Sequence, residues 1–471
     1  MDNKNNDHFS YPPDSDLDLS FTSCASAATT TTFSSSARSS LARSSLTLSF
    51  NESRLSSTTS ASTSIPSLHS RPHRQSDPNW SAIKTATNLS SDNTLHLRHF
   101  KLLRHLGSGN LGRVFLCRLR DNDHANFALK VIDRDSLTSK KICHVETEAQ
   151  ILSTLDHPFL PTLYAHLQVS HYTCLLIDYC PNGDLHNLLH KQPGYRLPVA
   201  SVKFYAAQVL VALEYLHAKG IVYRDLKPEN ILIREDGHIM LSDFDLCFNA
   251  DVDPKLETRT QLGKKRRSRN ACFRDRRPVE QVVTEFVAEP TNAFSKSCVG
   301  THEYLAPELV NGSGHGNGVD WWAFGILVYE MLYGTTPFKG STKESTLRNI
   351  ASNKGALFNE QENAEVKDLI EKLLVKDPRG RLGCSRGATD IKRHPFFNGV
   401  NWPLIRTLSA PEVRGIAFKR SKSHMSGMAL QKRRQWWRKG LSFLVGRNKF
   451  NLNSNHNYYC SINNDKVRKH V

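Results

Sequence analysis

The 471-residue sequence lacks several features that define large classes of protein. No stretch reaches about 18 consecutive apolar residues, so we expect no transmembrane helix. The polar beginning, MDNKNNDH at 1–8, is not typical of a signal peptide, and the ten cysteines include no C-x-x-C pair. We therefore expect a soluble intracellular protein with reduced thiols and no zinc site.

Acidic residues are scarce in two segments of this chain, whose formal net charge is +17. Residues 255–277 carry ten basic and two acidic side chains, and residues 414–471 carry fourteen basic and one acidic. Residues 1–97 carry seven basic and eight acidic side chains, so the rest of the chain has a net charge of −3. This distribution argues against a nucleic-acid-binding fold and indicates two basic appendages that locate the protein.

Residues 1–97 are rich in Ser, Thr and Ala and show no apolar periodicity. Such a segment cannot bury enough surface to offset its chain entropy, so we expect it to be disordered. The remaining residues suffice for one two-lobed domain of about 250 to 300 residues and a C-terminal extension.

The string YRDLKPEN at 223–230 is the most informative part of the sequence. It places a carboxylate at Asp225, a cation two residues later at Lys227 and an amide five residues later at Asn230. These groups can accept a proton from an attacking hydroxyl, screen a phosphate and hold a metal ion. The string matches the catalytic loop of a protein kinase, H-R-D-x-K-x-x-N, with Tyr223 in place of His.

A glycine-rich string, GSGNLGRV, precedes this loop at 107–114. Glycine lets a backbone approach phosphate oxygens without a Cβ in the way. The pattern alone also fits a Rossmann turn, but that turn opens a helix, whereas the residues that follow here are typical of a strand. The string therefore predicts a flap over ATP, with these contacts: Gly107, Gly109, Gly112 and Val114.

A lysine interrupts the apolar strand FALKVI at 127–132. Because an unpaired buried ammonium is costly, Lys130 needs a partner unless it lies on an edge strand and reaches solvent. After a glycine flap, the predicted role is contact with ATP phosphates and pairing with a helical Glu, and Ala128 joins the ATP contacts. We prefer Glu148, which lies toward the apolar face of the helix, over Glu146.

Asp243 follows a strand and stands where the D-F-G motif supplies a metal-binding carboxylate. Asp245 replaces the Gly of that motif, which would supply backbone freedom. The ligand itself is intact, and Asn230 supplies the second metal contact. An A-P-E string at 306–308 completes the set, and its Glu is expected to form a buried ion pair with Arg381.

These motifs resemble those of one branch of the protein kinases. Tyr223 and the string GTHEYLAPE at 300–308 resemble the AGC class of Ser/Thr kinases. Asp245 and the long insert that precedes the A-P-E string are similar to the plant-specific branch of that class. The Ser-rich run at 35–50 resembles the WAG kinases within the PINOID/WAG group, and the resemblance continues to about Trp402.

The resemblance implies an α+β, bilobal protein kinase fold with a small β-rich N-lobe, a larger helical C-lobe and disordered tails. The kinase domain would span 98–397, with an insert at 249–292 in the activation segment and a basic extension at 398–471. The implied cofactors are ATP and Mg²⁺, with the metal held by Asn230 and Asp243.

The same resemblance implies further contacts to ATP and to the catalytic loop. Residues 175–180 should form the strand and hinge that face adenine, including Asp178 and Cys180. Asp184 should meet the ribose. Thr301 should support the catalytic loop and favour Ser/Thr over Tyr substrates.

Substrate choice and activation are also predicted from this resemblance. Asp184, Glu229 and Glu330 stand where related kinases present carboxylates to substrate Arg, so we expect substrates with Ser or Thr near basic residues. Ser297 is predicted to be an activating phosphosite whose phosphate pairs with Arg224, and Ser295 is the alternative.

Two basic strings are predicted to locate the protein. KKRRSR at 264–269 could hold anionic lipid or act as a nuclear import signal, and a solvated loop is the alternative. KRRQWWRKGLSFLV at 432–445 combines cations with apolar bulk, as an interfacial anchor does, and docking on the kinase surface is the alternative. We expect the protein at the plasma membrane periphery, in the nucleus or in the cytoplasm.

By resemblance, the expected substrates are PIN-type auxin efflux carriers. We also expect a monomer, and the charge distribution predicts no specific nucleic-acid partner. The last residues lack the F-x-x-F motif with which many AGC kinases end, so activation through that motif is not expected. Two rival hypotheses remain: a pseudokinase scaffold, for which Asp245 is the only argument among the motifs, and a nuclear DNA-associated factor, suggested by the basic strings.

Overall fold

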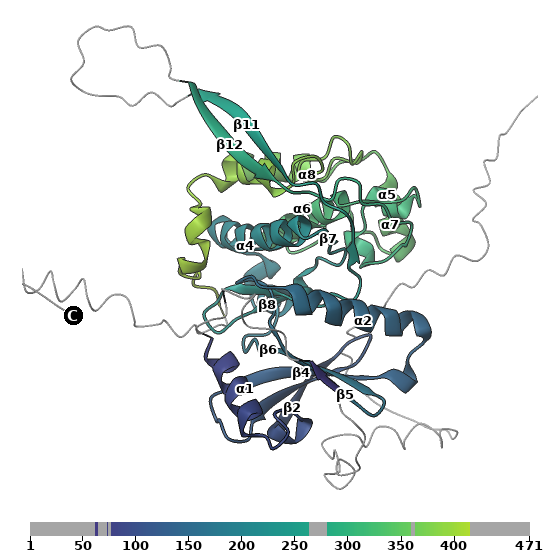
Figure 1. Ribbon diagram of the computed structural model, residues 1–471. Helices are drawn as coiled ribbons and strands as arrows, with labels where there is room; N and C mark the ends of the chain where they lie inside the picture. The colour runs from purple at the N-terminus through teal and green to yellow at the C-terminus, as the bar shows by residue number, and fades with distance from the viewer. Residues whose placement is uncertain (1–61, 65–72, 74–76, 263–279, 359–362, 415–471) are drawn as a thin grey trace, which may run out of the picture. The chain divides into compact units, whose positions relative to one another are not determined.

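The computed structural model describes residues 62–64, 73, 77–262, 280–358 and 363–414 (Figure 1). The predictions for residues 1–61, for the basic string at 264–269 and for the segment at 432–445 lie outside these residues. The described chain forms a sheet with one long helix, followed by a lobe of helices. This is the predicted arrangement of a β-rich N-lobe and a helical C-lobe.

The N-lobe is a six-stranded sheet in the order β1-β5-β6-β4-β3-β2, with antiparallel neighbours. Its apolar strand β4 lies inside the sheet, where Lys130 is opposite Val114 of β3 and Leu175 of β6. The lysine is therefore not on an edge strand. The elements are β1 (Ser62–Ser64), β2 (Phe100–Ser108), β3 (Arg113–Leu119), β4 (Asn126–Asp133), α2 (Ser139–Thr154), β5 (Leu163–Val169) and β6 (Tyr172–Asp178).

Residues 77–97 correct the predicted disorder of residues 1–97. Asp77 caps helix α1 (Pro78–Leu89) by accepting a backbone N–H of its first turn at 2.9 Å. Trp80 and Ile83 are buried in the N-lobe core. The prediction was wrong here because two large apolar side chains three residues apart dock a helix that is too short to be stable alone.

The C-lobe is built around two buried helices, α4 and α6. Helix α4 is long and apolar enough to cross a membrane by length and composition, but 61% of that stretch is buried in the structure, as is usual for a core helix. The elements are α3 (Leu185–His190), α4 (Val199–Ala218), β7 (Ile221–Val222), β8 (Ile231–Ile233), β9 (Ile239–Leu241), β10 (Phe248–Asn249), β11 (Lys255–Leu262), β12 (Glu280–Val287), α5 (Pro307–Val310), α6 (Gly318–Tyr333), α7 (Lys343–Ala351), α8 (Ala364–Leu373) and α9 (Ala388–Lys392).

Strands β11 and β12 form an antiparallel hairpin within the predicted insert at 249–292. The hairpin projects from the C-lobe beside α9 (Figure 1). Arginines at the two ends of α9 hold it there: Arg386 Nη2 donates to Glu285 at 2.9 Å, and Arg393 Nε donates to the same carboxylate at 2.8 Å. Arg386 also pairs with Glu257 of β11 at 2.8 Å, so both strands of the insert are attached to the C-lobe.

Candidate active site

The catalytic loop is held by a carboxylate from another element. Asp320, in the first turn of α6, accepts the backbone N–H groups of Tyr223 and Arg224, each at 2.7 Å. The Tyr223 hydroxyl donates to the carbonyl of Ser242. Arg224 has a left-handed backbone with φ of 67°, which a residue other than Gly rarely adopts and which these bonds stabilise. The strained backbone directs the next residue, Asp225, into the site.

The Asp225 carboxylate lies at the centre of a polar cluster. Lys227 Nζ lies 2.8 Å from one of its oxygens, and Asn230 Nδ2 lies 2.9 Å from the same oxygen. Thr301 Oγ1 donates to the other oxygen at 3.1 Å and accepts from Lys227 at 3.0 Å. The structure therefore brings together the predicted base, the predicted phosphate-screening cation and the predicted supporting hydroxyl.

Lys130 is buried and bridges two carboxylates. Its Nζ lies 2.7 Å from both Glu148 oxygens and 3.2 Å from Asp243 Oδ1. Burial works against its charge, but the Glu148 and Asp243 carboxylates outweigh burial and raise the pKa of Lys130, so the ammonium stays charged. Glu146 is exposed, so the preference for Glu148 was right.

The D-F-D string has its backbone strain at the metal-binding residue itself. Asp243 is left-handed with φ of 59°, whereas Asp245 is not among the described residues with positive φ. The absent Gly is therefore no obstacle to this backbone. Asp245 is buried, and burial together with the charge of Asp243 raises the pKa of the Asp245 carboxyl to about 8.

The glycine flap leaves room for a ligand on one side and packs tightly on the other. A Cβ built on Gly107 or Gly109 would have no neighbour within 4 Å. A Cβ on Gly112 would collide with the backbone carbonyl of Val131, so only Gly fits there. Ala128 is buried on β4, which pairs with the flap strand β3. The open side of the flap fits the close backbone approach that phosphates need.

The predicted hinge residues differ in how their side chains are used. The Asp178 carboxylate is buried and accepts the Thr162 N–H at 2.8 Å and the Tyr164 hydroxyl at 3.0 Å, so only its backbone is left to face a nucleotide. Burial raises the pKa of Cys180 to about 12, so its thiol is neutral. Asp184 caps α3 by accepting the backbone N–H of Asn187 at 2.7 Å.

Two predicted substrate-binding carboxylates interact beside the catalytic loop. Glu229 is exposed, and Glu330 of α6 is half-buried and accepts the Tyr304 hydroxyl. Burial raises the pKa of Glu330 to about 7, and the nearby charge of Glu229 adds to the rise. Because burial and the charge of Glu229 destabilise the ionised form of Glu330, pairing with a substrate Arg would stabilise it.

The two predicted phosphosites lie at different distances from Arg224. Its Nη1 is 3.4 Å from the Ser295 hydroxyl, and the Ser297 hydroxyl is 2.9 Å from that of Ser295. Ser297 is exposed and Ser295 is half-buried. The alternative residue is therefore the one in contact with Arg224, whereas the preferred residue is the more accessible.

Buried ion pairs join separate segments of the C-lobe around this site. The predicted pair is present: Arg381 donates to both oxygens of Glu308, at 2.7 and 2.9 Å. Sequence reasoning missed a second cluster, in which His217 contacts Glu289 and Asp320. No motif marks Glu289, because it lies in an insert with no fixed pattern, although its position among apolar neighbours was a signal of burial.

The residues present fit a nucleotide and a divalent cation. Because Asn230 donates through its Nδ2 to Asp225, its oxygen is the atom left to act as a ligand beside the Asp243 carboxylate. Carboxylate and amide oxygens suit hard divalent cations. Lys130 and the open flap would hold the phosphates.

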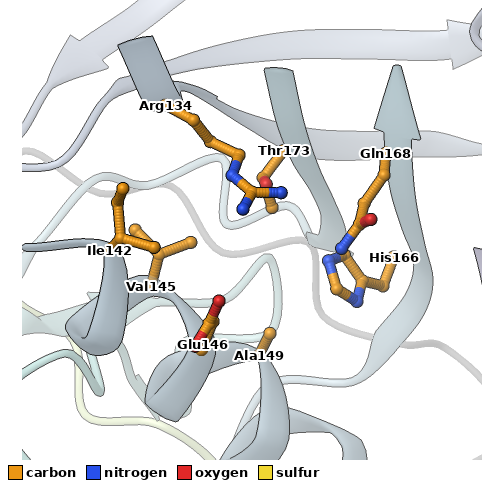
Figure 2. Close-up of a pocket in the computed structure, with 8 residues that line it drawn as sticks. All are labelled: Arg134, Ile142, Val145, Glu146, Ala149, His166, Gln168 and Thr173. Carbon is orange, nitrogen blue, oxygen red and sulfur yellow. The ribbon is translucent and has the colours of Figure 1, made fainter. Parts of the chain in front are cut away.

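A separate small cavity lies between α2 and strands β5 and β6 (Figure 2). It contains none of the residues predicted to bind the nucleotide, so we do not assign it to ATP. Its lining is mixed in polarity and comprises Arg134, Ile142, Val145, Glu146, Ala149, His166, Gln168 and Thr173.

Comparison with known proteins agrees with this geometry. Residues 100–265 and 282–397 match the protein kinase domain, and the chain therefore belongs to the protein kinase family. It is 63% identical to the serine/threonine-protein kinase WAG1 of Arabidopsis thaliana over 95% of this chain and 98% of that relative. It is 61% identical to WAG2 of the same plant, over 95% and 96%, and 45% identical to the protein kinase PINOID of Oryza sativa subsp. japonica, over 88% and 90%.

The chain is thus a serine/threonine protein kinase of the WAG/PINOID group. The predicted fold, enzyme class and resemblance are confirmed. This membership argues against both rival hypotheses, the pseudokinase scaffold and the DNA-associated factor.

Proposed function

We propose that this kinase uses ATP and Mg²⁺ to phosphorylate PIN-type auxin efflux carriers at Ser or Thr near basic residues, and so regulates polar auxin transport. The observation that carries the reaction is the Asp225 cluster, in which a carboxylate, a cation and a hydroxyl converge within 3.1 Å of one another. The choice of auxin carriers follows from the resemblance to the PINOID/WAG group.

In this reaction Asp225 orients the substrate hydroxyl and accepts its proton. Lys227 screens the phosphoryl group during transfer, and Thr301 holds both side chains in place. Lys130, whose Nζ lies 3.2 Å from Asp243, would hold the ATP phosphates. When bound by Asn230 and Asp243, Mg²⁺ would neutralise the charge that develops on the phosphates.

The test uses the full chain, labelled ATP, Mg²⁺ and two substrates: a basic Ser peptide and the cytoplasmic loop of a PIN-type carrier. We expect label in both, with loss of label in the Asp225→Asn form and after chelation of the metal. Label in the peptide alone would refute the carrier assignment. Label in neither would refute the reaction.

We also propose that the insert directs the kinase to an anionic membrane face, as a peripheral monomer. This proposal is supported by the charge of residues 255–277, with ten basic and two acidic side chains. The basic string follows β11 and precedes β12, so a hairpin separates it in sequence from the catalytic cleft. Attraction to anionic lipid is worth about 1 kcal/mol per basic residue near the surface.

A further inference from the structure

A buried imidazole joins the insert to the catalytic lobe. His217, near the end of α4, places Nδ1 2.7 Å from Glu289 Oε2 and Nε2 2.9 Å from Asp320 Oδ2. The three side chains are 0%, 3% and 0% exposed. Glu289 is the second residue after β12, so it belongs to the returning side of the insert. The cluster therefore links segments that are far apart in sequence.

Asp320 connects the His217 cluster to the catalytic loop through hydrogen bonds. The oxygen that accepts from His217 also accepts the Tyr223 N–H, and its other oxygen accepts the Arg224 N–H, each at 2.7 Å. Arg224 immediately precedes Asp225. Glu289 is therefore connected to the backbone before the proposed base through one imidazole and one carboxylate.

Glu289 is itself held in one position. Asn317 Nδ2 donates to its Oε2 at 2.9 Å. Gly387 is left-handed with φ of 58°, and a Cβ at that position would overlap the Glu289 carboxylate. A carboxylate confined in this way can hold the imidazole at a fixed position.

The charge of the cluster depends on Glu289. Burial lowers the pKa of His217, but Glu289 first and then Asp320 outweigh burial and raise that pKa to about 10. Only a protonated imidazole donates from both nitrogens, so both carboxylates receive a hydrogen. His315 and Arg224 also act on Asp320, and burial lowers the pKa of His315 to about 4, so that ring is neutral near pH 7.

We propose that Glu289 is a positioning residue for phosphoryl transfer, which holds His217 as a two-sided donor and so fixes Asp320 against the catalytic loop. The proposal rests on the reaction assigned to Asp225. The insert then does more than carry a basic string, because the segment that returns from it supplies part of the support for the reacting carboxylate. Loss of Glu289 should act on turnover rather than on the binding of ATP, whose proposed contacts lie on other elements.

The test compares full-length wild type with Glu289→Gln and with a matched control, Glu285→Gln, which removes a carboxylate from the same strand end outside the cluster. Turnover and KM for ATP are measured with a basic peptide from about pH 6 to about pH 9. In Glu289→Gln, His217 loses the carboxylate that raises its pKa most, so that pKa should fall and we expect the ring to deprotonate within this range. We expect turnover to fall about tenfold toward high pH, with KM for ATP unchanged, whereas wild type and control show no such fall.

A second substitution identifies the titrating group. In the double variant with His217→Gln, the fall toward high pH should disappear, whatever the absolute turnover. A profile for Glu289→Gln that matches the control, or a fall that persists in the double variant, would overturn the proposal. If Glu289→Gln does not fold, Glu289→Asp keeps the charge but shortens the side chain, and a profile for that variant identical to wild type in level and shape would overturn it. An inactive wild type would instead refute the assigned reaction.

Discussion

The catalytic loop and the insert hairpin are both held by charged side chains, but in opposite environments. The carboxylate that anchors the loop, Asp320, is fully buried, as is its partner His217. The pairs that hold the hairpin are partly exposed: Arg386 is 24% and Glu257 is 42% exposed. Buried pairs enforce a geometry because breaking them leaves an uncompensated charge, whereas exposed pairs are worth about 0–1 kcal/mol. The chain uses burial where the chemistry requires fixed positions.

The two regions also differ in their apolar residues. The side chains around the catalytic loop, such as Tyr223 and Leu226, are buried in the core. On the hairpin, Leu256 is 73%, Val282 is 68% and Phe286 is 59% exposed. An isolated two-stranded hairpin is marginally stable in water, so its attachment to α9 matters to its structure. The following substitutions test whether the catalytic loop and the insert hairpin contribute differently to activity and stability.

The largest effect is expected at the proposed base. Asp225→Asn keeps the shape of the side chain but removes its ability to accept a proton, so turnover should fall by about 10²- to 10⁴-fold. Lys130→Ala should lose activity as well, because it removes a phosphate contact. Labelled-ATP transfer and thermal unfolding are measured together. Retained activity in Asp225→Asn would refute the assignment of the base.

The free energy of unfolding should fall more when a buried ion pair is broken than when a partly exposed pair is broken. Arg381→Ala leaves the buried Glu308 without its partner, at an expected cost of about 3–5 kcal/mol in the free energy of unfolding. Arg393→Ala, beside the hairpin, removes two partly exposed pairs, with Glu285 and with Asp390, and should cost about 0–1 kcal/mol for each. Denaturant unfolding of both variants gives the two values. Equal losses would mean that burial is not what distinguishes the regions.

Phosphorylation of Ser297 should add negative charge near Arg224 of the catalytic loop. Ser297 is accessible and lies next to Ser295, which contacts Arg224. A phosphate there would gain a charge-assisted bond of about 1.5–3 kcal/mol, so Ser297→Ala should lower activity about tenfold. Mass spectrometry of active enzyme should find phosphate on Ser297, and Ser295→Ala is the matched control. Active enzyme with both hydroxyls unmodified would contradict the prediction.

Substrate preference should depend on pH through Glu330. Its pKa of about 7 means that the carboxyl loses its charge as the pH falls below that value. KM for an Arg-containing peptide should therefore rise at lower pH, by about tenfold at most, whereas KM for a matched peptide without Arg should change little. Glu229→Gln combined with Glu330→Gln should abolish the difference between the peptides. An unchanged preference would mean that the substrate acids lie elsewhere.

The comparison also explains what the sequence could predict. Asp225, Lys130 and Asp243 were recognisable because the reaction requires those residue types at those spacings. The Glu148 partner followed from helical periodicity. Glu289 was missed because its role depends on which segments meet in space, and its insert has no motif to show that. Helix α1 was missed because its docking depends on the sheet it packs against rather than on its own composition.

The smallest effect on catalysis is expected for the basic string of the insert, which lies apart in sequence from Glu289. The variant replaces the four consecutive cations Lys264, Lys265, Arg266 and Arg267 by Ala. Peptide phosphorylation should stay largely unchanged, because the catalytic cleft is built from other elements. Binding to anionic liposomes should fall, and wild-type binding should weaken with salt as the Debye length shrinks from about 10 Å at 0.1 M to about 3 Å at 1 M. The membrane or nuclear fraction in cells should fall in parallel.

A control with the same loss of charge tests whether the position of the cations matters. It replaces four exposed lysines scattered over the described surface: Lys84, Lys101, Lys354 and Lys367. If only total charge matters, both variants should lose liposome binding equally, which would contradict a role for the insert. If the insert variant binds liposomes and localises as wild type does, another segment determines localisation, and the Trp436-Trp437 string is the next to test. Loss confined to the insert variant would show that membrane attachment and catalysis depend on different segments of the chain.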